Sequence, residues 1–418
     1  MSTIYTDLLS LEKDKKAIRV GIIGAGQMGL GMAAQLSSLA GLRLAGICDH
    51  NLYKAKEAAD NYFNLSGHKY DKKMPIATDD YMDLLTSEDI DLIVEATGSV
   101  DGGAEIAQAC LDHNKHMVLL NVELDITAGP ILYKLFKEKN LIYTGSEGDE
   151  PAETFKLYEF AKSMGMEVLV IGKGKNNKVD FEADLETCRE EAEAKGMNPR
   201  MLASFKDGSK TMAEMNLLAN ATGYVPDIAG MHGVSGDLEG TVEKLRLKEE
   251  GGVLNSYGVV EYVDGIAPGV FAIVKGQNKF VCDELNYMLK EDGDRHILYR
   301  PFHLGSLETV MTIAKACLYG LDAIVPLKGQ VCDTVAVAKK DLEPGDRLDG
   351  MGGFCLRGQI EKHETTKQER HIPIGLIAGN TICKRPVKKG QILTFDDVDL
   401  DKSTHIYKLR EKQDREVG

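Results

Sequence analysis

The feature that most restricts the fold of this chain is a glycine motif near its N-terminus. Residues 20–29 run Val-Gly-Ile-Ile-Gly-Ala-Gly-Gln-Met-Gly, which places G-x-G-x-x-G directly between an apolar segment and a helical one. In that context Gly24 makes a tight turn, Gly26 lets the backbone approach a pyrophosphate, and Gly29 permits close contact between helix and sheet. The motif predicts a dinucleotide-binding turn that also includes Gln27 and Met28.

Polar residues after later apolar segments support this prediction. Asp49 ends the second segment, where its carboxylate can accept hydrogen bonds from the adenosine ribose. Thr97 and Gly98 follow a third segment and Asn121 follows a fourth, so we expect them to lie beside the nicotinamide.

The choice between NAD and NADP stays open on physical grounds. The carboxylate of Asp49 disfavours a 2′-phosphate through like-charge repulsion, whereas Lys54 and Lys56 could counter it.

Short apolar segments alternate with amphipathic ones as far as residue 150, which predicts an α/β fold with a Rossmann-type parallel sheet. Later residues mix helical and strand patterns, and the region after Asp333 has short, turn-rich strands. We therefore expect an N-terminal arm (1–17), a dinucleotide-binding domain (18–150), an α+β substrate and oligomerisation domain (151–330), a small β-rich domain (331–402) and a frayed tail (403–418).

Composition narrows the class of partner. The chain of 418 residues carries 50 Lys and Arg against 65 Asp and Glu, a net charge of −15. A field of that sign repels nucleic acids and anionic membranes, so neither is an expected partner. The eight cysteines include no C-x-x-C and no zinc-ligand spacing, which indicates reduced thiols in the cytoplasm. We expect a homo-oligomer that acts on a small anionic molecule.

Two segments are candidates for contact with that molecule. Lys173, Lys175 and Asn176 lie in a predicted glycine-rich loop that could hold an anion, and a solvated turn is the alternative. Lys210 and Glu214 are four residues apart at a predicted helix start, so they share one face. Lys210 would polarise a carbonyl group of the substrate, and Glu214 would orient the Lys210 side chain. The alternative is that the two residues form an ion pair on the surface.

Further candidates are single residues on predicted loops. Glu123 lies beside the expected nicotinamide as an acid or base, although its segment could be a loop cap. His232 and Arg300 are candidates for substrate binding, with a structural role as the default for the histidine. The acidic run 146–150 could hold Mg²⁺ or Mn²⁺, and an acidic turn is the alternative. The identity of any metal stays open.

Together, these motifs resemble those of the homoserine-dehydrogenase-like oxidoreductases that carry a C-terminal SAF domain, and most closely the reductoisomerase-like branch. The segments that carry the resemblance are Gly24–Gly29, Glu95–Gly98, Asn121–Glu123, Gly172–Asn176, Asp207–Met212, Ala229–Gly233 and Tyr299–Pro301. The resemblance implies a β-clip-like SAF domain at 331–402, preference for NADP, and Ser209 among the substrate-binding residues.

The known activity of that branch is the conversion of 1-deoxy-D-xylulose 5-phosphate to methylerythritol phosphate with NADPH, the reductoisomerase step of isoprenoid biosynthesis. Homoserine dehydrogenases place an Asn-Lys pair where Val122 and Glu123 stand here, which argues against homoserine oxidation. The alternatives are a homoserine-dehydrogenase-like or sugar-acid dehydrogenase, and a protein that senses NAD(P) without turnover.

Overall fold

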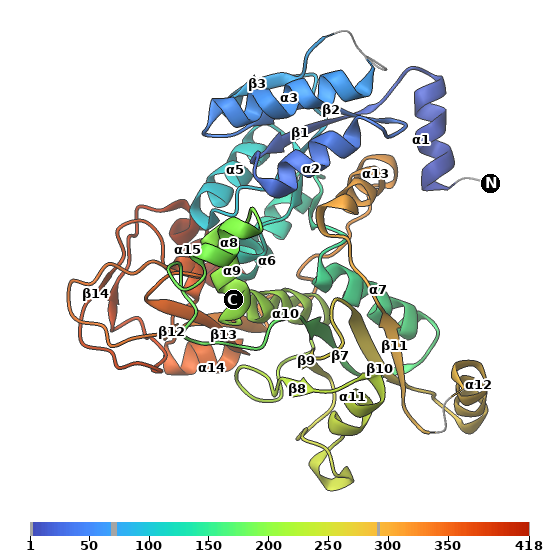
Figure 1. Ribbon diagram of the computed structural model, residues 1–418, viewed down its shortest axis with the longest axis vertical. Helices are drawn as coiled ribbons and strands as arrows, with labels where there is room; N and C mark the ends of the chain where they lie inside the picture. The colour runs from blue at the N-terminus through green and yellow to red at the C-terminus, as the bar shows by residue number, and fades with distance from the viewer. Residues whose placement is uncertain (1–2, 68–72, 291–292, 418) are drawn as a thin grey trace. The chain divides into compact units, whose positions relative to one another are not determined.

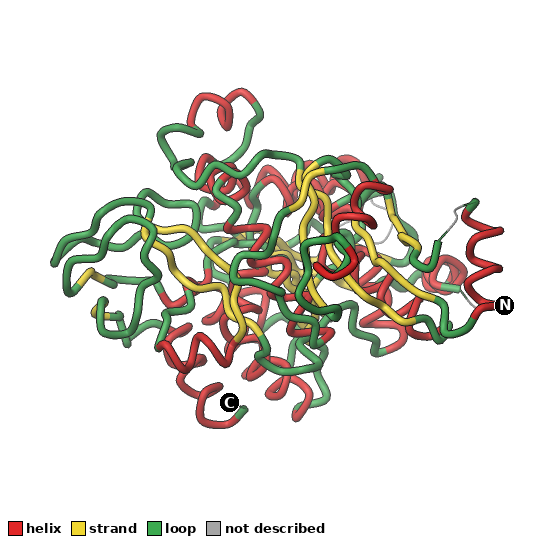
Figure 2. The backbone as a smooth tube through the Cα atoms, turned by 90° about the horizontal axis from the view of Figure 1, so that it is seen from below, coloured by secondary structure: helices red, strands yellow, loops and turns green. Residues whose placement is uncertain are grey.

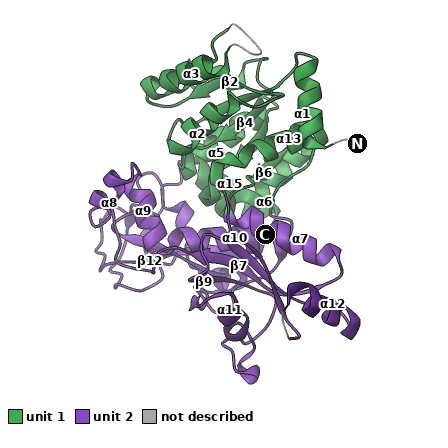
Figure 3. Ribbon diagram, turned by 45° about the vertical axis from the view of Figure 1, so that its right-hand side comes forward, with its two compact units in different colours: residues 1–149, 304–325, 405–418 green, residues 150–303, 326–404 purple. Residues whose placement is uncertain are grey.

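The computed structural model describes residues 3–67, 73–290 and 293–417. The chain forms two compact units (Figure 3): unit 1 comprises residues 1–149, 304–325 and 405–418, and unit 2 comprises residues 150–303 and 326–404. The predicted boundaries differ, because they placed 304–325 in the substrate domain and separated the last residues as a tail. Residues 1–2 and 418, parts of the predicted arm and tail, lie outside the described residues.

Unit 1 contains a parallel six-stranded sheet with the order expected of a doubly wound dinucleotide-binding fold. Part of this sheet is seen at the top of Figure 1. In spatial order the strands are β3 (Ile76–Thr78), β2 (Leu42–Cys48), β1 (Ile18–Ile23), β4 (Leu92–Glu95), β5 (His116–Leu119) and β6 (Tyr143–Gly145). The apolar segments predicted the central strands closely, but β3 is too short to give a clear pattern.

The helices of unit 1 are α1 (Ile4–Lys13), α2 (Gln27–Leu36), α3 (Leu52–Ser66), α4 (Met82–Leu85), α5 (Val100–Asp112), α6 (Val122–Glu138), α13 (Thr309–Tyr319) and α15 (His405–Glu416), with one 3₁₀ turn, η2 (Gly305–Leu307). The predicted arm is α1, whose Leu8 packs against the core. The predicted loop cap at Asn121 begins α6, because the Asn121 side chain accepts a hydrogen bond from the Leu124 amide at 3.2 Å.

The C-terminal segment is a helix and not the frayed tail that its charge suggested. In α15, Ile406 and Leu409 are buried, and the helix contacts α5 and α6. Pro130 lies inside α6, where its missing amide hydrogen removes one helical hydrogen bond. Gln413 Oε1 accepts from the Ile131 amide at 3.2 Å, and Arg410 donates to the carbonyl of residue 127 at 3.2 Å. Polar side chains of α15 thus bind backbone groups of α6 on either side of its proline.

Unit 2 contains a mixed five-stranded sheet. In spatial order its strands are β11 (His296–Arg300), β10 (Val270–Lys275), β7 (Glu167–Lys175), β9 (Val259–Asp264) and β8 (Val234–Ser235). The predicted loop at 172–178 is wrong in its first half, because β7 continues to Lys175. The glycines allow close packing there: a Cβ at Gly172 would lie 1.9 Å from the carbonyl oxygen of Glu261 on β9.

The rest of unit 2 consists of helices and of a C-terminal module that follows residue 330. The helices are α7 (Glu150–Ser163), α8 (Arg189–Ala194), α9 (Pro199–Lys206), α10 (Ser209–Thr222), α11 (Leu238–Lys244), α12 (Lys279–Leu289) and α14 (His363–Glu369), with 3₁₀ turns η1 (Lys248–Glu250) and η3 (Ile374–Leu376). The module has two strand pairs, β12 (Cys332–Ala338) with β13 (Leu356–Lys362) and β14 (Ile382–Cys383) with β15 (Val398–Asp399). Loops make up much of it, as the green tube at the left of Figure 2 shows.

Helix α10 is the most enclosed element of unit 2. Every one of its 14 residues is buried, and it contacts α7, α9, β9, β12 and β13.

In the described part of the chain, no helix combines the length and apolar character that a membrane span requires.

We expect Gln413→Ala to destabilise unit 1, because it leaves the buried Ile131 amide without its partner. An unsatisfied buried donor costs about 1 to 3 kcal/mol. Urea denaturation followed by circular dichroism should show a lower midpoint for this variant. Glu411→Ala, on the exposed face of the same helix, is the control; equal midpoints for the two variants would contradict the role of α15.

Candidate active site

The glycine turn of unit 1 has the geometry that a dinucleotide requires. Gly24 has φ +110°, and a Cβ there would lie 2.6 Å from the backbone of residue 96. A Cβ at Gly29 would lie 1.9 Å from the Gly24 carbonyl oxygen, whereas one at Gly26 would meet no atom within 4 Å. The first and third glycines are therefore needed for packing, and the second leaves space where a pyrophosphate fits at the start of α2.

Asp49 reinforces this turn. Its Oδ2 accepts from the Ala25 amide at 2.8 Å, and its Oδ1 accepts from the Asn51 amide at 2.9 Å. The carboxylate thus stabilises the turn from the end of β2, the position at which such a residue contacts the ribose in dinucleotide-binding folds. Gln27 and Met28 are exposed beside it.

The segment that follows β4 is organised by a residue that the sequence analysis missed as a site residue. Glu95 is fully buried, and its Oε1 accepts from both the amide and the hydroxyl of Thr97. Burial raises the pKa of Glu95 to about 7. The Asn121 amide group donates to the Ser99 carbonyl at 2.9 Å, so Asn121 connects the loops after β4 and β5. Gly98, which lies between Thr97 and Ser99 in the sequence, has φ +67°.

In unit 2, the central ion pair involves Lys173 on β7. Its ammonium group contacts Glu150 of α7 at 2.7 Å and also contacts Glu214 of α10, and all three side chains are at least 85% buried. Burial alone would lower the pKa of Lys173, but the two carboxylates outweigh it and raise the pKa above its ordinary value. Burial and the nearby Glu150 raise the pKa of Glu214, against the effect of the lysines.

A second cationic side chain, Arg300, lies at the same level of the sheet as Lys173. Val270 of β10 pairs with Lys173 on one side and with Arg300 of β11 on the other. Arg300 forms an ion pair with the fully buried Glu153 of α7, and His303 Nε2 lies 3.3 Å from Glu150 Oε1. Helix α7 therefore presents Glu150 and Glu153, one turn apart, to cations at the end of the sheet.

Lys175 differs from its neighbours in its partner. It is 5% exposed, and its ammonium group donates to the Phe205 carbonyl at 2.6 Å. Burial, and then the charge of Lys173, lower the pKa of Lys175 to about 8. Lys173 and Lys175 lie two positions apart on a strand and so share one face of the sheet.

The structure places Lys210 and Glu214 in the interior and excludes the alternative of a surface ion pair. Lys210 is 8% exposed and Glu214 is 1% exposed, and the charge of Lys210 opposes the rise in the pKa of Glu214. Ser209, proposed for substrate binding, is fully buried, and its hydroxyl accepts from the Gly358 amide at 2.7 Å. This contact gives Ser209 a structural role.

The remaining candidates lie outside the Lys173 ion pairs. Asn176 is exposed after the end of β7, and Glu123 is half-buried in the first turn of α6. His232 Nε2 lies 2.8 Å from Asp227 Oδ2, and its amide donates to the buried Glu261.

Two of the carboxylates considered as metal ligands have ammonium partners. Glu147 of unit 1 forms an ion pair with Lys315, and Glu150 of unit 2 pairs with Lys173. These contacts favour the alternative in which the acidic run has a structural role.

Three family models match successive parts of the chain. A family model for the catalytic domain of oxidoreductase DRL matches residues 148–309, the NAD-binding domain of homoserine dehydrogenase matches residues 24–144, and the SAF domain matches residues 333–399. The chain is therefore similar to an oxidoreductase catalytic domain over residues 148–309 and to an NAD-binding domain over residues 24–144. The domain matches and the two sheets confirm the predicted fold: a Rossmann-type domain, an α+β domain and a small β-rich SAF module, as we call the C-terminal module from here on.

Individual relatives match this chain over short segments or at low identity. Glycosyl hydrolase family 109 protein 2 of Shewanella sp. (strain ANA-3) is 35% identical over 85 residues, which is 19% of this chain and 17% of that protein. The corresponding protein of Shewanella amazonensis is 31% identical over 83 residues, again 17% of its length.

Among solved structures, a probable dehydrogenase from Thermotoga maritima is similar at 15% identity and a TM-score of 0.45. The similarity covers 74% of this chain and 92% of the other. A putative myo-inositol dehydrogenase from Sinorhizobium meliloti 1021 is similar at 13% identity and a TM-score of 0.42, over 73% and 91% of the two chains.

We expect Gly26→Val to abolish dinucleotide binding without unfolding unit 1, because its side chain would enter the space for the pyrophosphate, where a Cβ meets no protein atom within 4 Å. Isothermal titration with NADPH measures the loss. Gly31→Ala, at a glycine within α2 whose Cβ would also be unobstructed, should bind normally. Undiminished NADPH affinity in Gly26→Val would refute the assigned pyrophosphate position.

Proposed function

We propose that the protein transfers hydride between NADP(H) and a small anionic hydroxylated carbonyl compound, a sugar phosphate or a sugar acid. The observation that carries the proposal is the ammonium group of Lys175. Within the described residues its polar contact is the Phe205 carbonyl, and it has no carboxylate at ion-pair distance. A buried charge without a directly paired counter-charge is unfavourable, so an anionic substrate group would be stabilised there.

Each neighbouring side chain has a separate task in this proposal. Lys173 is neutralised by Glu150 and Glu214, so it supports the site and leaves anion binding to Lys175. Lys210 donates a hydrogen bond to the reacting carbonyl oxygen and stabilises the alkoxide that forms, and Glu214 fixes its orientation. A bound nicotinamide supplies or accepts the hydride.

The more specific activity that we propose to test is reduction and isomerisation of 1-deoxy-D-xylulose 5-phosphate. It rests on the resemblance of the motifs and on the anionic phosphate, which suits Lys175. NADP is proposed on the same resemblance.

The first experiment is a substrate panel with the purified protein, in which the oxidation of NADPH and of NADH is followed by absorbance. The panel contains 1-deoxy-D-xylulose 5-phosphate, other ketose phosphates, keto sugar acids and aspartate semialdehyde, which homoserine dehydrogenases reduce. Turnover of the phosphates or sugar acids supports the proposal. Turnover of the semialdehyde alone indicates a homoserine dehydrogenase, and NADPH binding without any turnover indicates a sensor.

We expect the affinity for the anionic substrate to fall as the pH rises through about 8. The pKa of Lys175 is lowered to about 8, so the group is charged below that pH and neutral above it. The phosphate of a sugar phosphate is already doubly charged in this range, since its second pKa is about 6. KM measured between about pH 7 and 9 should therefore rise with the titration of Lys175.

Lys175→Met should raise KM about tenfold at neutral pH and remove this pH dependence, because the charged donor is lost. Lys178→Met, an exposed lysine three residues later, is the matched control. A KM that rises through pH 8 equally in both variants would show that another group is responsible.

Lys210→Met should lower kcat about a hundredfold while the Kd for NADPH stays constant. The substitution keeps the length of the side chain and removes its charge, and loss of one donor to a developing oxyanion costs about 3 to 4 kcal/mol. Steady-state kinetics with the substrate found in the panel measures the change. A kcat within about twofold of the parent would exclude Lys210 from the chemistry.

A further inference from the structure

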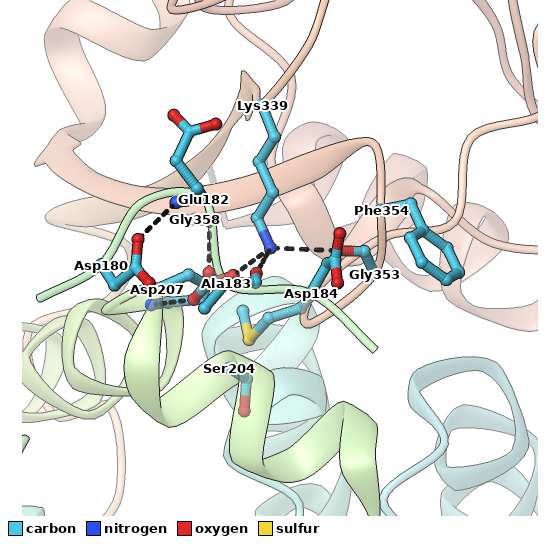
Figure 4. A network of polar contacts seen from close by, with 12 residues as sticks. Asp180, Glu182, Ala183, Asp184, Ser204, Asp207, Lys339, Gly353, Phe354 and Gly358 are labelled. Atoms are coloured by element: carbon cyan, nitrogen blue, oxygen red, sulfur yellow. Dashed lines mark hydrogen bonds and ion pairs between the residues drawn. The ribbon is translucent and has the colours of Figure 1, made fainter. Parts of the chain in front are cut away.

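The start of α10 is tied to the SAF module by a buried ion pair (Figure 4). Asp207, just before the helix, is fully buried, and its Oδ1 accepts from the Ser209 amide at 2.8 Å. Its Oδ2 lies 2.6 Å from the ammonium group of Lys339, the residue that follows β12. Lys339 also donates to the carbonyls of Ala183 at 2.6 Å and Gly353 at 3.0 Å. All three ammonium hydrogens therefore have an acceptor.

The edge of β13 supplies two more contacts, on the side that does not pair with β12. The Gly358 amide donates to Ser209 Oγ at 2.7 Å, and the Ile360 carbonyl accepts from the Gly230 amide at 2.8 Å. A Cβ at Gly358 would lie 2.7 Å from Thr334 Cγ2, so a side chain there would require Thr334 or the strand to move. One strand edge thus contacts both the start of α10 and the loop 229–233.

We propose that the SAF module is a positioning element of the candidate active site: Lys339 and the edge of β13 fix the first turn of α10, and through it Lys210 and Glu214. Lys339 acts through Asp207 and is a positioning residue. The inference rests on the proposed function only where it assigns Lys210 and Glu214 to turnover. The mechanical connection itself rests on the contacts of unit 2.

The strength of the connection follows from the burial of its charges. Asp207 and Lys339 are 0% and 5% exposed, so each charge depends on the other. Removing one partner of a buried pair leaves an uncompensated charge and is strongly destabilising. Asp207 Oδ1 accepts from the amide of Ser209, the first residue of α10, so a displaced Asp207 would leave the start of the helix without this contact.

The test compares Lys339→Met with Lys388→Met in the full-length protein. Lys388 pairs with Asp341 on the exposed surface of the same module, which makes it a matched control. Hydrogen–deuterium exchange is measured at the amides of residues 209–212 and 230. We expect exchange there to rise about tenfold in Lys339→Met alone, while the amides of β7 and β10 keep their protection.

A double variant covers the case in which Lys339→Met does not fold. The double variant Asp207→Asn with Lys339→Met removes both charges of this buried pair. The asparagine keeps an oxygen that can accept from the Ser209 amide, whereas the contacts of Lys339 with Ala183 and Gly353 are lost. The same amides should again exchange faster than in the parent. Parental exchange at 209–212 in every folded variant, or an equal rise over the whole of unit 2, would overturn the proposal.

Kinetics separates positioning from a loss of stability. Where the substrate panel gives turnover, kcat of folded Lys339→Met, or of the double variant, should fall about tenfold while the Kd for NADPH is unchanged. An unchanged kcat with faster exchange at 209–212 would overturn the link to catalysis. If no compound is turned over, the exchange measurement alone decides the connection, so failure of the proposed function is distinguished from failure of this inference.

Discussion

The ammonium group of Lys173 is the charge around which unit 2 is organised. It connects β7 to Glu150 of α7 and to Glu214 of α10, and all three groups are buried. Such a cluster persists only where each charge has its counter-charge, because the desolvation of a single ion costs several kcal/mol. The positions of both helices on the sheet are therefore coupled to one side chain, and the lysine next to it on the same face, Lys175, has a lowered pKa partly because Lys173 keeps its charge.

The enclosure of α10 extends this coupling to the C-terminal module. The helix contacts α7 and β9, and it also contacts β12 and β13. Two buried lysines, Lys173 and Lys339, thus hold it through Glu214 and through Asp207 at its start. In unit 1 the dinucleotide turn is stabilised differently, by glycine packing and by hydrogen bonds from backbone amides to Asp49. We infer that the cofactor site depends on backbone geometry, whereas the candidate catalytic site depends on buried side-chain charge.

This difference explains how much the sequence could predict. The glycine spacing and the apolar segments carry local information, so the Rossmann-type sheet and its turn were predicted closely. The buried ion pairs of unit 2 join residues that are 23 to 147 positions apart in the sequence, so no local pattern contains them. They are the pairs of Lys173 with Glu150 and Glu214, and of Arg300 with Glu153. No local pattern in the sequence indicates the role of Lys339, for the same reason. The sequence also made α15 look like a charged tail, because the hydrogen bonds of the buried Arg410 and Gln413 are made to the distant helix α6. The glycines at 172 and 174 suggested a loop, although they serve close packing within a strand.

The measurement that tests the central claim most directly is the pKa of the Lys175 ammonium group, followed by NMR of selectively labelled lysine with and without a saturating sugar phosphate. In the free protein the account predicts a pKa of about 8, lowered from the ordinary 10.5 by burial and by Lys173. Bound anion should raise it by about one unit or more, since a tenfold preference of the anion for the charged lysine corresponds to one unit. A pKa near 10.5 in the free protein, or one that does not respond to the sugar phosphate, would contradict the account.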